Sequence, residues 1–432
     1  MSRSSLLHDS LGVPDPLRRA RIVKDLESVT TRGDESDPRD VGMTRDNVEA
    51  IWKAVQSLYR SGIHPAISLC IRREGQVVLE RAIGHASGNG PGDHRDAEKV
   101  LATPDTPFCI FSASKGTTAT LIHLLDEKGL LHIGDPVAEY LPEFARNGKS
   151  NITIGHVLSH RAGVPNAPKG ALTFDTIDDW QAQREYMYDA KPLSRAGTKQ
   201  AYHAVSGGSL LGEVVREITG RSIRDVLAEE ILDPLGFRWM NYGVAPGDLG
   251  RVGINYPTGP PPVPPLSTFL TRALGVHPDE ATRMSNDPRF LSAVLPAANG
   301  VSTANELGRF YEMLRCGGEL DGVRVMSPRT IRRARVAQSH LEVDGSLGLP
   351  IAFSYGYMLG GKVLSLYGPN TTKAFGHLGW INIMGWADPE RALSVGLITT
   401  GKSVIYPELA RFWEIGHRIG LEAAPVTRTM EG

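Results

Sequence analysis

The order of the predicted elements restricts the fold of this chain more than any other feature. Residues 43–62 carry apolar side chains at helical spacing after Thr44, a typical N-cap residue. Residues 66–86 hold two apolar runs on either side of Glu74-Gly75, which predicts a β-hairpin. The globular part therefore begins with a helix followed by two antiparallel strands.

Strands return near the other end of the chain. Residues 362–370, 374–390 and 392–402 have the pattern of short strands separated by turns, and 407–422 has the pattern of an amphipathic helix. Between the two ends, from Ser112 onwards, the segments are mainly helix-like. Because strands and helices at both ends bracket a helical middle, we expect both ends to complete one sheet.

These patterns predict an α/β (α+β) fold, in which an antiparallel β-sheet is flanked by helices and carries a mainly helical inserted subdomain. The predicted divisions are an irregular N-terminal arm at 1–42, a sheet domain formed by 43–125 plus 290–432, and a helical subdomain at 126–289. The helical part includes 257–265, which has six prolines and predicts a stiff surface excursion. That excursion is a candidate lid or pocket wall.

Charge and cysteine content exclude several functional classes. The 432 residues include 47 Lys plus Arg and 48 Asp plus Glu, so no net field attracts nucleic acid or an anionic membrane. Cys70, Cys109 and Cys316 form no CxxC pair, so we expect small core residues rather than a disulfide framework or a metal site. The first forty residues hold no signal-peptide core, and no apolar run reaches the ~18 residues of a membrane span. These features predict a cytoplasmic protein.

The candidate nucleophile lies in Ser112-Ala113-Ser114-Lys115. A serine and a lysine three residues apart share one helix face, so the amine can reach the hydroxyl. The apolar run PFCIF before Ser112 predicts a strand-to-helix turn, and at a helix N-terminus the macrodipole favours both an alkoxide and a neutral lysine. The alternative is an ordinary surface helix, because the bare pattern is expected about once by chance in a chain of this length.

Three other patterns point to different chemistry. Residues 396–403, GLITTGKS, fit the P-loop of nucleoside triphosphatases, but their first glycine lies inside a predicted strand. His156 and His160 have the spacing of a helical metal pair, but no third ligand is evident, which favours a structural role. Ser209 is set as in a GxSxG nucleophile elbow, but Leu211 replaces the last glycine. None of the three fits its sequence context.

Three spaced motifs occur together and in order, namely Ser112-Ala113-Ser114-Lys115, Tyr202, and His377-Leu378-Gly379. From about residue 45 to 425 the chain resembles the serine β-lactamase-like family, which includes class C β-lactamases, penicillin-binding DD-peptidases and related carboxylesterases. The first motif matches the family's Ser-x-x-Lys, and the second lies where the family has Tyr-x-Asn. The third is Lys-Thr-Gly in β-lactamases and often His-x-Gly in esterases. Within the family, the resemblance is closest to carboxylesterases of the family VIII type.

The resemblance implies a role for each motif residue. Ser112 is expected to be the acylated nucleophile and Lys115 its proton acceptor, while Tyr202 passes the proton to the leaving group. The backbone N–H groups of Ser112 and Trp380 are expected to form the oxyanion hole. His377, Gly379 and Trp380 are expected to line the substrate-binding site. No metal and no cofactor is implied.

Two departures from the family pattern bear on the substrate. Ala204 stands where many β-lactamases and peptidases have asparagine, and His377 stands where they have lysine. The missing carboxamide would hold a substrate amide, and the missing ammonium would pair with a substrate carboxylate. Both losses favour esters. Trp380 and Trp386 near the third motif predict an apolar pocket, although each also fits a core position.

The sequence therefore predicts a serine carboxylesterase that hydrolyses small to medium esters through an acyl-enzyme on Ser112. Its expected partner is a small-molecule ester, with no nucleic acid and no membrane span. The alternatives are a β-lactamase or D-amino-acid peptidase, an acyltransferase with the same nucleophile, and a ligand sensor without turnover.

Overall fold

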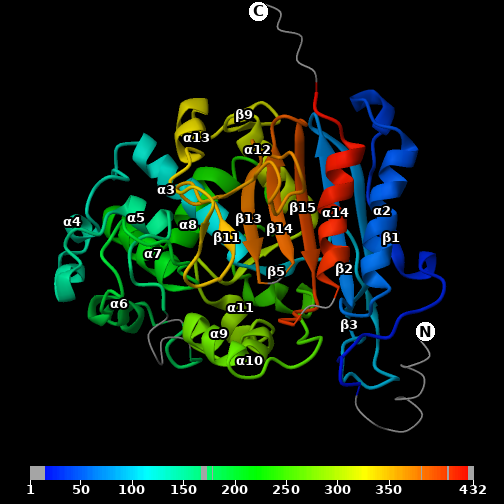
Figure 1. Ribbon diagram of the computed structural model, residues 1–432, viewed down its shortest axis with the longest axis horizontal. Coiled ribbons are helices and arrows are strands. Elements are labelled where there is room, and N and C mark those ends of the chain that lie inside the picture. The colour runs from blue at the N-terminus through cyan, green and yellow to red at the C-terminus, as the bar shows by residue number, and fades with distance from the viewer. Residues whose placement is uncertain (1–14, 167–172, 178, 381, 406–407, 427–432) are drawn as a thin grey trace, which may run out of the picture.

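An eight-stranded antiparallel sheet forms the centre of the protein (Figure 1). The computed structural model describes residues 15–166, 173–177, 179–380, 382–405 and 408–426. The strand order is β1-β3-β2-β15-β14-β13-β12, and β4 pairs with β3. The strands are β1 (Thr30–Arg32), β2 (Ala66–Arg73), β3 (Gln76–Ser87), β4 (Val100–Leu101), β12 (Met358–Leu359), β13 (Phe375–Gly379), β14 (Ile383–Asp388) and β15 (Leu393–Thr399). The expected fold class, an antiparallel sheet flanked by helices, is confirmed.

Both elements predicted at the start of the globular part are present. Thr44 caps α2 (Arg45–Tyr59) by accepting a hydrogen bond from the Asn47 backbone N–H. Strands β2 and β3 form the hairpin, and its turn residues Glu74 and Gly75 have φ of 50° and 86°, the left-handed values that a tight hairpin turn requires. The free side of β2 pairs with β15. Strands from both ends of the chain therefore share one sheet.

Alternate residues of each central strand bury opposite faces of the sheet. In β2, Ile67 and Leu69 pack under α2 and α14 (Leu409–Glu422), whereas Ala66 and Cys70 face the cluster that contains α12 (Ala304–Arg315). Figure 1 shows α2 and α14 side by side on one face of the sheet. This alternation of buried faces accounts for the nearly continuous apolar composition of the strands.

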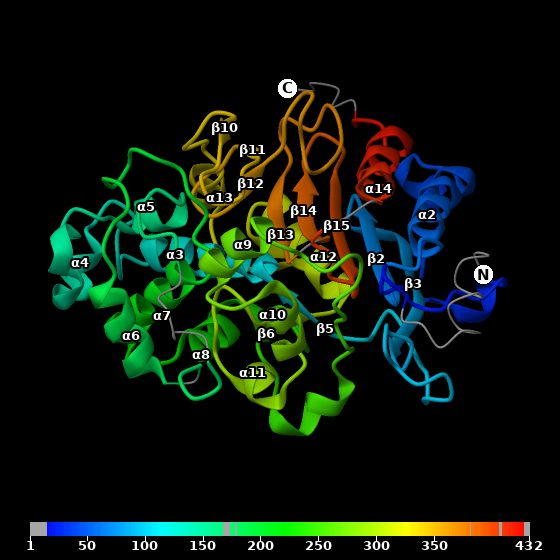
Figure 2. The same cartoon turned by 60° about the horizontal axis from the view of Figure 1, so that its bottom comes forward.

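The middle of the chain is mainly helical, as predicted, and lies beside the sheet (Figure 2). The helices of this region and of the segment after it are α3 (Lys115–Glu127), α4 (Val137–Tyr140), α5 (Ile154–Leu158), α6 (Trp180–Asp189), α7 (Ser206–Thr219), α8 (Ile223–Leu227), α9 (Leu266–Leu274), α10 (Pro278–Met284), α11 (Pro288–Ser292) and α13 (Pro328–Ala334). A three-stranded sheet, β5 (Phe108–Phe111), β7 (Gly300–Ser302) and β6 (Asn241–Tyr242), connects this region to the main sheet. Two short hairpins lie outside these sheets, β8 (Glu319–Leu320) with β9 (Val323–Arg324) and β10 (Glu342–Val343) with β11 (Pro350–Ile351). The domain boundaries stay a prediction.

The segment predicted to be an irregular arm contributes a strand. Within its described residues 15–42, β1 pairs with β3 and so covers an edge of the main sheet. Arg18 donates to the carbonyl oxygens of Thr258 and Gly259 in the proline-rich segment 257–265. Gly259 also lies against the Ser403 side chain. These contacts place the proline-rich segment against the arm and the end of β15.

The cysteines divide into two groups. Cys70 and Cys109 are buried, as expected for small core residues. Cys316 is exposed, contrary to the prediction, because it caps the C-terminal end of α12, where the chain turns at Gly317 with φ of 73°. Among the described helices, none combines the length and the apolar character that crossing a bilayer requires.

The segment that fits a P-loop pattern is an inner strand of the sheet. Residues 393–399 form β15, which pairs with β14 and β2 on its two sides. A Cβ added at Gly396 would lie 2.1 Å from the Ala304 carbonyl oxygen and 2.8 Å from the Gly308 nitrogen. The glycine therefore permits the close approach of α12 to the sheet, and the loop geometry of a phosphate site is absent from this part of the described chain.

Replacing Gly396 with alanine should destabilise the protein, because the added methyl group collides with the α12 backbone. We expect the free energy of unfolding in urea to fall by about 2 kcal/mol. Gly134→Ala is the matched control, since nothing lies within 4 Å of a Cβ at that turn, and its effect should stay within about 0.5 kcal/mol. Equal stability of the two variants would contradict the close packing of α12.

Candidate active site

Ser112 lies where a buried strand turns into a helix. Strand β5 ends at Phe111, the 3-10 helix η3 (Ser112–Ser114) follows, and α3 begins at Lys115. The turn depends on Phe111, whose φ of 49° and ψ of −131° are unusual for a residue with a side chain. The Ser114 hydroxyl closes the turn by donating to the Phe111 carbonyl oxygen at 2.6 Å. The chain therefore presents Ser112 at the N-terminal end of a long buried helix, as predicted.

The Lys115 amine is held by three oxygen atoms. Its Nζ lies 2.8 Å from Ser112 Oγ, and it donates to the carbonyl oxygens of Ala204 at 2.7 Å and Ala297 at 2.9 Å. Lys115 is 8% exposed, and this burial lowers its pKa well below the ordinary value for lysine. The site therefore favours a neutral amine.

A neutral amine has two hydrogens and one lone pair. The two carbonyl oxygens can only accept, so they take both hydrogens of Lys115. The lone pair is then left facing the Ser112 hydroxyl, which can donate its proton to Nζ. This arrangement suits Lys115 to act as a general base toward Ser112.

Tyr202 reaches the same hydroxyl from the segment that precedes α7. The Ser112 side chain interacts with its phenol, and the Tyr202 ring centroid lies 4.9 Å from Lys115 Nζ. Burial raises the pKa of Tyr202 above the ordinary value, so the phenol keeps its proton at neutral pH. The structure thus brings together the three residues that the motifs singled out.

Asp344 holds Tyr202 in place, and sequence reasoning missed it. This carboxylate lies fully buried after β10, and its Oδ1 accepts from the backbone N–H groups of Tyr202, Ser346 and Leu347. A second bond, from the Gly345 N–H to the Gln200 carbonyl oxygen, fixes the same turn. No pattern near Asp344 marks it, because its partner is 142 residues away along the chain.

The third motif lies on β13, next to the start of the nucleophile helix. A Cβ at Gly379 would lie 2.3 Å from the carbonyl oxygen of Ile110, so only glycine lets β13 approach β5 this closely. His377 is buried, and its Nδ1 lies 2.8 Å from the Leu378 carbonyl oxygen. Burial, together with Lys115, lowers the pKa of His377 to about 3, so the imidazole is neutral.

The two tryptophans near the third motif differ in environment. Trp380 follows Gly379, is half-buried, and donates from Nε1 to the Thr282 hydroxyl on α10 at 3.2 Å. Trp386 is fully buried on the other face of the sheet, stacked on Tyr367 with ring centroids 5.6 Å apart. Trp386 therefore takes the core position that the sequence left open, and only Trp380 lies beside the site.

Two further residues that the sequence singled out, His156 and Ser209, have structural positions. His156 accepts the Thr153 backbone N–H at 3.1 Å and so belongs to the cap of α5. Ser209 lies inside α7 rather than on a strand-to-helix turn. No group of three or more His, Cys, Asp and Glu side chains within the described ranges is arranged to hold a metal ion.

Comparisons with known proteins agree with this geometry. Residues 46–415 match the model of the family described as Beta-lactamase. An esterase/beta-lactamase, LipL, from Mycobacterium tuberculosis is 30% identical over 377 residues, which cover 85% of this chain and 84% of LipL. A penicillin-binding protein homologue from Caulobacter crescentus has a TM-score of 0.74 at 28% identity and covers 88% of this chain and 99% of its own. A family VIII carboxylesterase also has a TM-score of 0.74, at 27% identity, and covers 87% of this chain and 98% of its own.

Asp344→Ala should destabilise the protein and loosen Tyr202, because three buried N–H groups lose their acceptor. We expect the free energy of unfolding to fall by at least about 2 kcal/mol. Asp344→Asn keeps an acceptor oxygen and should lose less than half as much. Urea titration of both variants measures the difference, and equal losses would mean that the carboxylate charge, rather than the acceptor, holds the turn.

Proposed function

We propose that this chain, which belongs to the beta-lactamase family, is a serine carboxylesterase that cleaves small to medium uncharged esters through an acyl-enzyme on Ser112. Its relatives and structural neighbours are esterases and other hydrolases of the same fold. The observation that carries the proposal is the buried amine of Lys115 at 2.8 Å from Ser112 Oγ, since burial lowers the pKa of this amine and the pair can then generate an alkoxide.

The reaction begins when Ser112 Oγ attacks the ester carbonyl and its proton moves to Lys115 Nζ. The carbonyl oxygen becomes an oxyanion, which the backbone N–H groups of Ser112 and Trp380 stabilise. Tyr202 donates its proton to the leaving alcohol, and Lys115 returns a proton to Tyr202. Water then attacks the acyl-enzyme with the same groups acting in reverse, which releases the acid and restores Ser112.

The charge of the pocket favours esters over β-lactams and D-amino-acid peptides. His377 occupies the position of the family's lysine, and its neutral imidazole offers no positive charge to a substrate carboxylate. Ala204 has no side-chain amide, and its backbone carbonyl is engaged with Lys115. His377, Gly379 and Trp380 line the substrate site in this proposal.

The alternatives share the acyl-enzyme and differ in its origin and its fate. A β-lactamase or D-amino-acid peptidase uses the same nucleophile on a charged amide substrate. An acyltransferase passes the acyl group to an alcohol instead of to water, and a sensor retains the acyl group. Turnover of substrates from different classes, together with the mass of the acylated protein, distinguishes these alternatives.

Ser112→Ala should abolish ester hydrolysis, because the nucleophile, its base and the oxyanion donors act as one unit. We expect kcat for p-nitrophenyl esters, from acetate to decanoate, to fall by about 10⁴-fold or more. Ser209→Ala is the matched control, since that serine lies on α7 outside the proposed chemistry, and it should keep full activity.

A chromogenic cephalosporin measured beside the esters tests the substrate class. Rapid ester release with little cephalosporin opening supports the esterase. Comparable efficiency on both would favour the β-lactamase or peptidase alternative. A persistent adduct in intact-mass spectrometry would instead indicate a sensor.

The pH dependence of kcat/KM should follow Lys115. Activity is low while the amine is protonated and rises with pH as it becomes neutral, so a lowered pKa places the plateau well below the ordinary lysine value of 10.5. The raised pKa of Tyr202 predicts no loss from its ionisation up to about pH 10. A pH-stat assay measures the profile. His377→Gln should leave the acid limb in place, and a limb that vanishes in this variant would make His377 the base.

A further inference from the structure

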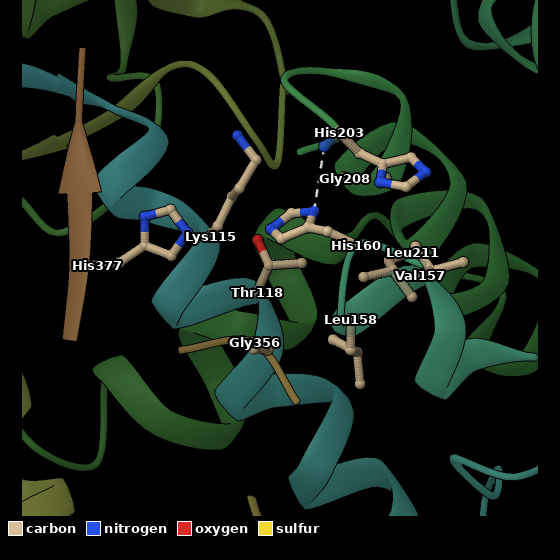
Figure 3. Close-up of a pocket in the computed structure, with 12 residues that line it drawn as sticks. Lys115, Thr118, Val157, Leu158, His160, His203, Gly208, Leu211, Gly356 and His377 are labelled. Atoms are coloured by element: carbon tan, nitrogen blue, oxygen red, sulfur yellow. Dashed lines mark hydrogen bonds between the residues drawn. The ribbon is translucent and has the colours of Figure 1, made fainter. Parts of the chain in front are cut away.

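A small cavity lies beside the aliphatic part of Lys115 (Figure 3). It has about 30 Å³ of space for the centre of a water molecule, enough for one water. Apolar side chains of α5 and α7 form much of its wall, but Thr118, His160, His203 and His377 also line it. Three buried imidazoles around one cavity require an account of their hydrogen bonds.

The hydrogen bond of His377 defines its tautomer. Its Nδ1 lies against the Leu378 carbonyl oxygen, which can only accept, so Nδ1 carries the hydrogen. Since the imidazole is neutral, Nε2 has a lone pair. This Nε2 is buried and makes no hydrogen bond to any described residue.

His160 has the opposite tautomer. Its Nδ1 accepts the backbone N–H of His203 at 3.1 Å, so its hydrogen lies on Nε2. Burial lowers the pKa of His160 well below the ordinary value, which keeps this ring neutral as well. Its Nε2 makes no hydrogen bond within the described part of the chain. The backbone of His160 is left-handed, with φ of 58°.

Two of the unused nitrogens around the cavity are complementary, and His203, whose two ring nitrogens are also buried without a hydrogen bond to the described residues, is the third ring that lines it. His160 offers an N–H and His377 a lone pair, and Figure 3 shows the two rings pointing toward each other across the cavity. Leaving the buried His377 Nε2 unsatisfied costs about 1–3 kcal/mol. A water molecule can accept from one ring and donate to the other.

We propose that the cavity holds an ordered water that links His160 to His377, and that His160 is thereby a positioning residue for the catalytic groups. The Tyr202 ring packs on this pair, with its centroid 4.5 Å from that of His160 and 6.1 Å from that of His377. The bridge keeps the His377 ring, the Tyr202 ring and the Lys115 chain in one arrangement. Its catalytic consequence rests on the proposed esterase function, whereas the bridge itself does not.

The water positions the site rather than relaying protons to Lys115. The three oxygen neighbours of Lys115 Nζ fill all the directions in which a tetrahedral nitrogen can bond beyond its own carbon. The cavity also faces neutral groups, since burial lowers the pKa of His203 to about 3.

Two substitutions of His160 separate the bridge from ordinary packing. His160→Asn keeps an acceptor near Nδ1 and tolerates the left-handed backbone, but loses the donor to the cavity. His160→Gln reaches the position of Nε2 with an amide N–H but loses the bond from His203. If the bridge matters, Asn should lower kcat about 10- to 100-fold with little change in KM, and Gln should recover most of the loss. If His160 serves only for packing, the Gln variant should lose more kcat than the Asn variant. That result would overturn the proposal.

The tautomers themselves can be observed without turnover. In ¹⁵N-histidine-labelled wild-type protein, long-range ¹H–¹⁵N correlation spectra should show His377 protonated at Nδ1 and His160 protonated at Nε2. The His377 Nε2 resonance should shift in His160→Asn and stay in place in His94→Asn, whose side chain is 81% exposed. Opposite tautomers, or an unmoved resonance in His160→Asn, would overturn the bridge even if both variants lose activity. If the esterase proposal is wrong, Ser112→Ala will not lose ester hydrolysis. That result would leave these spectra of the wild-type protein unchanged.

Discussion

The withdrawal of one lysine amine from water is the constraint on which the rest of the site depends. An amine can act as a base only while it is neutral, and burial without a carboxylate partner lowers the pKa of Lys115. Two backbone carbonyls fix its hydrogens and therefore the direction of its lone pair. These carbonyls come from Ala204 and Ala297, which lie far from Lys115 in sequence, so the loops before α7 and β7 must both be in place before the Lys115 amine is held beside Ser112.

The sheet supplies the rigidity that such a site needs. Gly379 lets β13 come within van der Waals contact of β5, and Gly396 does the same for α12 and β15. At both positions the absence of a side chain lets two backbone segments pack closely. The unusual conformation of Phe111 is held by its burial, its pairing with Gly300 on β7 and the bond from the Ser114 hydroxyl, so the strain beside Ser112 is supported by the surrounding structure.

The sequence predicted those parts that depend on local pattern. The N-cap at Thr44, the Glu74-Gly75 turn and the spacing of Ser112 and Lys115 all follow from neighbours in the chain. Asp344 could not be found in this way, because its partner lies on a distant segment. His160 was noticed only for its spacing from His156, since its contacts with Tyr202, His203 and the cavity cannot be read from the local sequence. Cys316 was placed wrongly in the core, since apolar neighbours in sequence do not show that a helix ends there. The core position of Trp386 could be assigned only from the structure, which shows that α14 covers its face of β14.

The pairing of β2 with β15 has a consequence for how the chain matures. Residues such as Cys70 and Gly396 are neighbours in the sheet but more than three hundred positions apart along the polypeptide. During synthesis, the β2–β3 hairpin leaves the ribosome with one long edge whose backbone N–H and C=O groups have no strand partner until nearly the whole chain has been made. Such distant pairing slows folding.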